Sequence, residues 1–207
     1  MNDMKTSQRE GEVFMSSCQI AERYDRRWAA YTERSLGLLR PFISEAPGRL
    51  LDVGCGTGAL LSVLRIDPVR YVGVDLSAEM LRGAARHPQA GLIRAEAGAL
   101  PLRDASFDLA VSASSLHDWA SPDAGLREIR RVLAPGGRLL LVDWCADHLP
   151  IRLMRAWLTA TARPVRQVYT EAELREILAQ AGFGVTATRR ARISPVWGMM
   201  VAEALPG

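Results

Sequence analysis

Three glycines and two carboxylates around the first apolar run are the residues of this sequence best suited to chemistry. Gly54, Gly56 and Gly58 stand at alternate positions directly after the apolar run 50–53. Glycine lets a ligand approach backbone N–H groups and adopts positive φ at no steric cost. Apolar residues recur between 60 and 64, which indicates a helix whose first N–H groups point at the same ligand. The segment therefore predicts a strand, a ligand-binding loop and a helix.

The two carboxylates are Asp52, inside the first apolar run, and Asp75, which ends a second apolar run. A strand, a glycine loop, a helix and a strand ending in an acid form the nucleotide-binding half of an open α/β sheet. The acid then accepts hydrogen bonds from ribose hydroxyls. Because Gly54-x-Gly56-x-x-Ala59 also satisfies the loose dinucleotide pattern, an NAD(P)-binding oxidoreductase is one alternative.

The loop resembles motif I of the class I S-adenosylmethionine-dependent methyltransferases. Asp52 stands where a dinucleotide loop usually has an apolar residue, and Gly58 adds a third glycine. Further matches follow in order along the chain: Asp75, the Glu96-Ala97 pair, the strand-like run 107–112, and the helix and turn 126–137. The resemblance covers most of the chain, from Tyr24 to Ala202.

This resemblance implies that S-adenosylmethionine is the cofactor and lies across the carboxyl ends of the first four strands. Asp52 would anchor the ammonium end or orient the loop, and Asp75 would bridge the ribose hydroxyls. Leu76, Glu96 and Ala97 would surround the adenine, although the family more often has aspartate where Glu96 stands. Cys55 is expected to contribute backbone rather than a thiol. The full set of expected cofactor-binding residues is Tyr24, Asp52, Gly54, Cys55, Gly56, Gly58, Asp75, Leu76, Glu96, Ala97 and Ser112.

Methyl transfer requires a nucleophile held in line with the sulfonium and shielded from water, and a base only where the nucleophile loses a proton. His117, beside Asp118, is the candidate base, and packing against the methionine end of the cofactor is its other possible role. The run 112–119 lacks the Asn/Asp-Pro-Pro-aromatic signature of enzymes that methylate base or glutamine amino groups. This favours a small-molecule acceptor, with oxygen, carbon, nitrogen and sulfur all open. The expected acceptor-binding residues are Trp28, Tyr31, Trp144, Cys145 and His148.

The composition of the chain limits the partners and the compartment that are expected. The 207 residues, 48% hydrophobic and 24% charged, suit one globular domain. No apolar run approaches the ~20 residues that cross a bilayer, and the polar N-terminus lacks a signal peptide, so no membrane partner is expected.

Three cysteines without a C-x-x-C pair suggest no disulfide framework and no metal site, which favours a cytoplasmic protein. The basic run 189–192 has no interleaved aromatics, so no nucleic-acid partner is expected; arginine-rich composition or a charged edge strand explains it. The oligomeric state is not indicated.

The remaining pattern predicts the elements that position these residues. Residues 1–12 are expected to form a mobile tail, and 13–207 a single domain with a helical cap at 13–45 and a sheet core at 46–207. Helices are expected near 77–86, 121–133, 151–158 and 170–182, and the strands after the first two near 91–95, 107–112, 138–143, 185–193 and 196–202. The predicted fold is α/β: a doubly wound, Rossmann-like, mostly parallel seven-stranded sheet with an antiparallel last strand and helices on both faces. A cofactor-binding regulatory module without catalysis is a further alternative.

Overall fold

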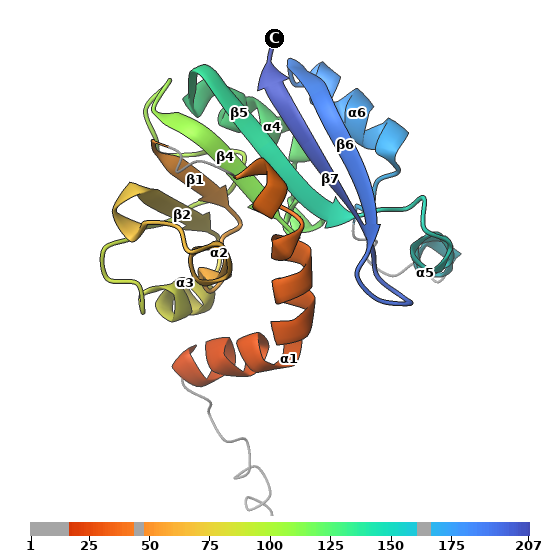
Figure 1. Ribbon diagram of the computed structural model, residues 1–207, viewed down its shortest axis with the longest axis horizontal. Helices are drawn as coiled ribbons and strands as arrows, with labels where there is room; N and C mark the ends of the chain where they lie inside the picture. Colours follow the sequence, from red (N-terminus) through yellow and green to blue (C-terminus); the bar gives the residue numbers. More distant parts are fainter. Residues whose placement is uncertain (1–16, 44–47, 161–166) are drawn as a thin grey trace, which may run out of the picture.

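A seven-stranded sheet forms the centre of the protein (Figure 1). The computed structural model describes residues 17–43, 48–160 and 167–207, so the predicted tail 1–12 lies outside the described residues. The strand order is β3-β2-β1-β4-β5-β7-β6. The strands are β1 (Leu50–Val53), β2 (Tyr71–Asp75), β3 (Gly91–Arg94), β4 (Phe107–Ala113), β5 (Leu133–Trp144), β6 (Phe183–Arg192) and β7 (Gly198–Pro206). The first five pair in parallel and β7 runs antiparallel to both its neighbours, which confirms the predicted fold class.

Helices cover both faces of this sheet. They are α1 (Ser17–Gly37), α2 (Ala59–Leu64), α3 (Ala78–Ala84), α4 (Pro122–Val132), α5 (Leu149–Ala160) and α6 (Glu171–Gln180), with 3-10 turns η1 (Arg40–Phe42), η2 (Pro68–Arg70) and η3 (Leu116–Asp118). Figure 1 shows α4 and α6 behind the sheet and α1 in front, where α1 packs on α2 and α3. None of the helices in the described ranges is both long and apolar enough to span a bilayer.

The two faces arise from the alternation of side chains along each buried strand. Leu50 and Leu140 belong to the core on the α1 and α2 side, whereas their neighbours Leu51 and Leu141 belong to the core against α4 and α6. All four are at most 2% exposed. Since both faces are covered, the central strands read as continuous apolar runs, as parallel strands do.

Local signals set three of the helix ends. Ser77 Oγ accepts the Met80 N–H at 3.3 Å at the start of α3. Thr170 and Glu173 form the expected capping box of α6, with bonds of 3.2 and 2.8 Å. Gly182, with φ of +82°, follows the end of α6. These three features follow from residues close in sequence, which is why the pattern predicts them.

The fifth strand differs from its prediction. It begins at Leu133 rather than at Arg138, because Phe107 pairs with Leu133 and Leu109 with Arg138. The residues between them, 134–137, form a bulge inside the strand, and Gly136 there has φ of +79°. Residues 135–137, the Pro-Gly-Gly segment expected as a turn before the strand, therefore form part of a bulge within β5. The basic run 189–192 lies on β6, the edge strand of the sheet.

Candidate functional site

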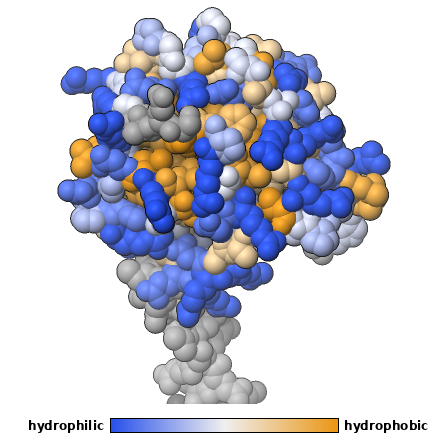
Figure 2. Space-filling model, in the orientation of Figure 1, coloured by the Kyte–Doolittle hydropathy of each residue, from blue (hydrophilic) through white to orange (hydrophobic). Residues whose placement is uncertain are grey.

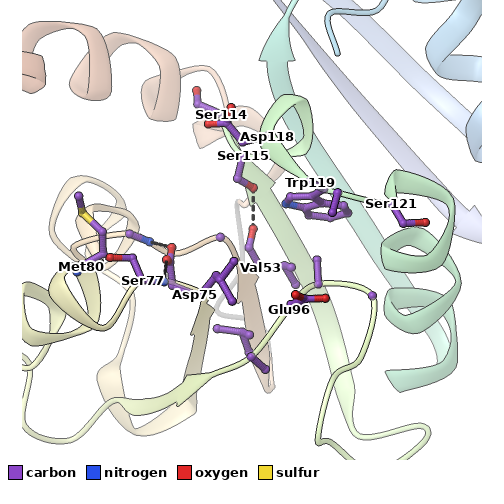
Figure 3. A pocket seen from close by; sticks show the side chains of 18 of the residues that line it. Val53, Asp75, Ser77, Met80, Glu96, Ser114, Ser115, Asp118, Trp119 and Ser121 are labelled. Atoms are coloured by element: carbon purple, nitrogen blue, oxygen red, sulfur yellow. Dashed lines mark hydrogen bonds between the residues drawn. The ribbon is translucent and has the colours of Figure 1, made fainter. Parts of the chain in front are cut away.

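A cavity of about 500 Å³ lies at the carboxyl ends of β1, β2, β3 and β4. Figure 3 shows Asp75, Ser77 and Met80 on one side of it, Trp119 and Glu96 on the other, and Val53 between them. Of the expected cofactor-binding residues, those that line it are Tyr24, Gly54, Gly56, Asp75, Leu76, Glu96 and Ala97. Ligands of open α/β sheets bind in this crevice, and the volume is that of a small-molecule site.

The loop after β1 requires glycine for two separate reasons. Gly54 has φ of +78°, and a Cβ at this position would collide with the side chain of Ser115. Gly56, with φ of +54°, places its backbone against the cavity with no neighbouring atom where a Cβ would stand. Gly58, with φ of +74°, precedes the first residue of α2 and lines neither this cavity nor the smaller one described below. At Gly54 and Gly56 the loop therefore presents backbone rather than side chains to the cavity. The N–H groups of Gly54 and Gly56 are already bonded within the protein, to the Val74 carbonyl and to Asp75.

Asp75 joins the loop to the cavity. One of its carboxylate oxygens accepts the Gly56 N–H at 2.8 Å and the other accepts the Ser77 N–H at 2.8 Å (Figure 3). The side chain is half-buried and lines the cavity. Because each carboxylate oxygen has two lone pairs, both oxygens can accept a further hydrogen bond from a ligand hydroxyl.

Asp52 lies on the other side of the loop. It is 2% exposed and its Oδ2 accepts the Tyr71 hydroxyl at 2.7 Å. Burial raises the pKa of Asp52 to about 7, which the Tyr71 hydrogen bond opposes. The side chain faces a second cavity of about 90 Å³ beneath α1, which Cys55 also lines. Burial also raises the pKa of the Cys55 thiol, which suits a residue that contributes backbone only.

The two cavities meet at residues that line both: Tyr24, Gly54, Gly56 and Ser114. Ser112, the last expected cofactor-binding residue, is 1% exposed and lines neither cavity. Its hydroxyl lies 2.8 Å from that of Ser115, which lines the larger one. Ser112 thus acts on the site through Ser115, whose Oγ in turn donates to the Val53 carbonyl at 2.8 Å (Figure 3).

His117, the predicted base, is buried behind the cavity. Its side chain is 4% exposed, and Nδ1 lies 2.6 Å from Asp143 Oδ1. Its Nε2 lies 3.5 Å from Oδ2 of Asp118, whose side chain is 53% exposed and lines the cavity. Asp143, His117 and Asp118 therefore form a row of side chains that runs from the core to the cavity wall. The sequence singled out His117 because it follows the fourth strand with Asp118 beside it, and it gave no sign that Asp118 is the member facing the cavity.

Three expected acceptor-binding residues come together in an aromatic cluster. Trp144 stacks on His117 at 4.2 Å between ring centres and on Trp197 at 4.9 Å. Trp28 and Tyr31 meet the edge of Trp197 at 6.5 and 5.8 Å. Sequence reasoning missed Trp197, whose only signal was an aromatic residue close to the start of the last strand.

Tyr31 ties this cluster to the cavities. Its hydroxyl accepts the Trp144 Nε1–H at 2.8 Å and lies 2.8 Å from the Ser114 hydroxyl. Burial raises the pKa of Tyr31, so the hydroxyl keeps its proton at neutral pH. Tyr31 also lines the smaller cavity. One hydroxyl on α1 therefore holds that helix against the ends of β4 and β5.

The other two expected acceptor-binding residues lie apart from this cluster. Cys145 is fully buried, its Sγ is 3.5 Å from Asp147 Oδ2, and burial raises its pKa to about 11. His148 packs against Gly198, where a Cβ would collide with the imidazole. Neither lines either cavity. Across the part of the chain that the structure describes, no three His, Cys, Asp or Glu side chains gather as metal ligands.

Comparison with known proteins identifies the family. Residues 20–188 match a family model described as a methyltransferase domain, which is most of the chain. The chain belongs to this methyltransferase family. The resemblance to class I S-adenosylmethionine-dependent methyltransferases that motif I and the four later matches indicate is thereby confirmed.

Relatives at the sequence level include two methyltransferases. A malonyl-[acyl-carrier protein] O-methyltransferase of Enterobacter lignolyticus is 36% identical over 117 residues, 56% of this chain and 46% of the relative. A ubiquinone/menaquinone biosynthesis C-methyltransferase of Syntrophotalea carbinolica is 37% identical over 134 residues, 61% of this chain and 54% of the relative. The chain spans about half the length of the curated relatives it matches.

Solved structures share the fold over nearly the whole chain. A S-adenosylmethionine-dependent methyltransferase of Thermotoga maritima, described as a possible histamine N-methyltransferase, superimposes with a TM-score of 0.75 at 20% identity. It covers 92% of this chain and 97% of its own. A putative methyltransferase of Haloferax volcanii, solved with the activator Trm112, gives a TM-score of 0.77 at 20% identity and the same coverage. At such identities the likeness establishes the fold alone.

Proposed function

We propose that this methyltransferase moves a methyl group from S-adenosylmethionine to a small-molecule acceptor by in-line displacement. The observation that supports it most is the convergence of the Gly54 loop, Asp75 and the Glu96-Ala97 pair on one cavity. The relatives described above are methyltransferases and not NAD(P) oxidoreductases. By name they include one O- and one C-methyltransferase, which supports a small acceptor and leaves its reacting atom open.

The residues of the cavity fit a sulfonium nucleoside. Asp75 offers two carboxylate oxygens to vicinal hydroxyls, and the glycine loop leaves its backbone accessible where side chains would block it. Leu76 is 59% exposed although it lines the cavity, so a ligand base would cover apolar surface that the protein itself leaves open. Glu96 can accept from an exocyclic amine beside it. Asp52, Cys55, Gly58 and Ser112 would hold the loop from behind.

When bound, S-adenosylmethionine supplies a methyl group already activated on sulfur, so the chain must position the acceptor and exclude water. Tyr31, which lines the smaller cavity, would be the member of the aromatic cluster nearest the acceptor. Trp28, Trp144 and Trp197 line neither cavity and would support Tyr31 from behind. Where the acceptor must lose a proton, Asp118 would receive it at the cavity, and His117 would orient Asp118 from behind. His117 then acts through Asp118 and not on the acceptor directly.

We also propose one domain over residues 13–207, a cytoplasmic location and no nucleic-acid partner. Residues 13–45 would act as a cap on the sheet core 46–207, since α1 packs on α2 and α3 and brings Tyr24 and Tyr31 to the cavities. The two cysteines whose side chains the structure describes, Cys55 and Cys145, are free thiols, in keeping with a reducing compartment.

Isothermal titration tests the cofactor, and product labelling tests catalysis. We expect the protein to bind S-adenosylmethionine and not NADH. Incubation with methyl-labelled donor and a cell extract should then label a compound of low molecular weight. Binding of NADH without a response to S-adenosylmethionine would show an oxidoreductase instead. Binding of the methyl donor without any labelled product would favour the regulatory module.

A further inference from the structure

Helix α5 carries apolar side chains on the face that it turns away from the protein. Leu149, Leu153 and Trp157 recur every fourth residue, which places them along one side of the helix. They are 55%, 60% and 51% exposed. On the opposite side, Ile151 is fully buried in the core. The helix therefore packs into the core through the side that carries Ile151, while the side chains of Leu149, Leu153 and Trp157 stay more than half exposed.

The turn between β6 and β7 extends this apolar face. Val196 in the turn is 54% exposed. Gly198, directly after the turn, packs against the side chain of His148, directly before α5, so the turn and the start of the helix are neighbours. Figure 1 shows α5 beside this turn, and Figure 2 shows hydrophobic residues at the same margin of the molecule. Contiguous exposed apolar residues of this kind mark an interaction surface.

The charges around this face have one sign. Neither α5 nor the turn residues 193–197 include an aspartate or glutamate, whereas the exposed Arg152 and Arg192 lie on the helix and at the start of the turn. Carboxylates beside the helix already pair with other arginines: Asp147 lies 3.7 Å from Arg190, and Glu173 lies 3.0 Å from Arg155. The face is thus apolar at its centre and cationic at its rim.

We propose that α5 and the β6–β7 turn form a membrane-docking face that binds the surface of an anionic lipid bilayer. Leu149, Leu153, Trp157 and Val196 enter the headgroup region, while Arg152 and Arg192 meet lipid phosphates. Tryptophan and arginine both suit this boundary, since each combines an apolar body with a polar end. Twelve residues of helix span about 18 Å, too short to cross a bilayer, so α5 lies along the surface.

Charge favours a lipid surface over a second copy of the chain. In a twofold dimer through this face, the arginine rims of the two copies would meet each other. The sequence-based expectation of no membrane partner considered only a spanning segment, whereas surface docking needs a single apolar face. Since α5 follows the carboxyl end of β5, the docked bilayer lies at the same edge of the sheet as the candidate cofactor cavity.

Vesicle sedimentation of the full chain tests this proposal, without cofactor so that it is independent of the proposed function. We expect binding to phosphatidylcholine vesicles that contain phosphatidylglycerol, little binding to pure phosphatidylcholine, and weaker binding as salt rises. The double variant Leu153→Ser/Trp157→Ser should lower the partition coefficient roughly tenfold or more. Arg152→Gln/Arg192→Gln should lower it about thirtyfold, since each arginine near the surface contributes about 1 kcal/mol. The matched control is Val69→Ser, which removes a 68% exposed apolar side chain from η2 and should change nothing.

Several results would overturn the proposal. The wild-type chain could fail to bind anionic vesicles, or Val69→Ser could weaken binding as much as the α5 variant. Equal binding to neutral and anionic vesicles would remove the role of the arginines. Sedimentation velocity supplies the last check: a wild-type dimer that Leu153→Ser/Trp157→Ser converts to monomer would make this face a contact between copies. Thermal unfolding of each variant confirms that any loss of binding is not a loss of fold.

Discussion

Replacement of Asp75 by alanine removes the carboxylate that would bind the ribose. In the structure each oxygen accepts one backbone N–H at 2.8 Å, so the carboxylate is already held in one orientation and retains a lone pair on each oxygen. Two charged hydrogen bonds to ribose hydroxyls contribute roughly 1.5 kcal/mol each at the lower end of the usual range. We therefore expect the dissociation constant for S-adenosylmethionine to rise roughly hundredfold, and tenfold, ~1.4 kcal/mol, as a minimum. Asp75→Asn keeps the shape of the side chain without its charge, so its dissociation constant for S-adenosylmethionine should lie between those of wild type and Asp75→Ala.

The control for this prediction is Asp108→Ala. Asp108 is also a carboxylate on a parallel strand that accepts a backbone N–H, that of Arg49 at 2.7 Å, but it lies at the amino end of β4, away from the cavity. Both alanine variants should lower the melting temperature slightly, and only Asp75→Ala should weaken binding in the titration. A dissociation constant within twofold of wild type for Asp75→Ala would show that this carboxylate does not contact the nucleoside.

Three further changes test the site from different directions. Where the acceptor must lose a proton, Asp118→Asn should lower turnover roughly hundredfold while cofactor affinity stays unchanged; full activity would remove Asp118 from proton transfer. Asp52 should destabilise the fold as pH rises from about 4 to about 7, since burial raises its folded-state pKa to about 7 and the unfolded chain releases the proton earlier. Urea unfolding at each pH gives the free energy of unfolding of wild type minus that of Asp52→Asn, and this difference should fall by about 4 kcal/mol across that range. A difference that does not change with pH would contradict the buried position of Asp52. Gly54→Ala should cost at least ~2 kcal/mol in urea unfolding because of its positive φ and the collision with Ser115, whereas Gly184→Ala on open β6 should stay within about 0.5 kcal/mol; equal costs would refute the loop geometry.

The parts of the fold that depend on neighbouring residues could be predicted from the sequence. The glycine loop and the capping box at Thr170 each lie within one turn, and Asp75 stands at the end of one apolar run, so each is visible in the local sequence. The seven strands and the antiparallel last strand follow from the alternation of apolar runs and turns. The bulge at 134–137 could not be predicted, because it reflects the register between β4 and β5 and not the local Pro-Gly-Gly pattern alone.

The site was predicted less completely, and the gaps have a common cause. Whether His117 or Asp118 faces the cavity depends on the 3-10 turn η3 and on Asp143, 26 residues further along the chain. Trp197 reaches the aromatic cluster only because β7 pairs with β5, which sets it against Trp144. Contacts of this kind are fixed by strand register and helix packing, so a local pattern has no signal for them.

The hydrogen bond from Gly56 to Asp75 has a consequence for how fast a ligand is captured. Because the Asp75 carboxylate holds the loop in place without a bound ligand, a nucleoside that binds in the cavity need not order the loop. Association should consequently be limited by diffusion, and the binding entropy measured by calorimetry should lack the unfavourable contribution of loop ordering.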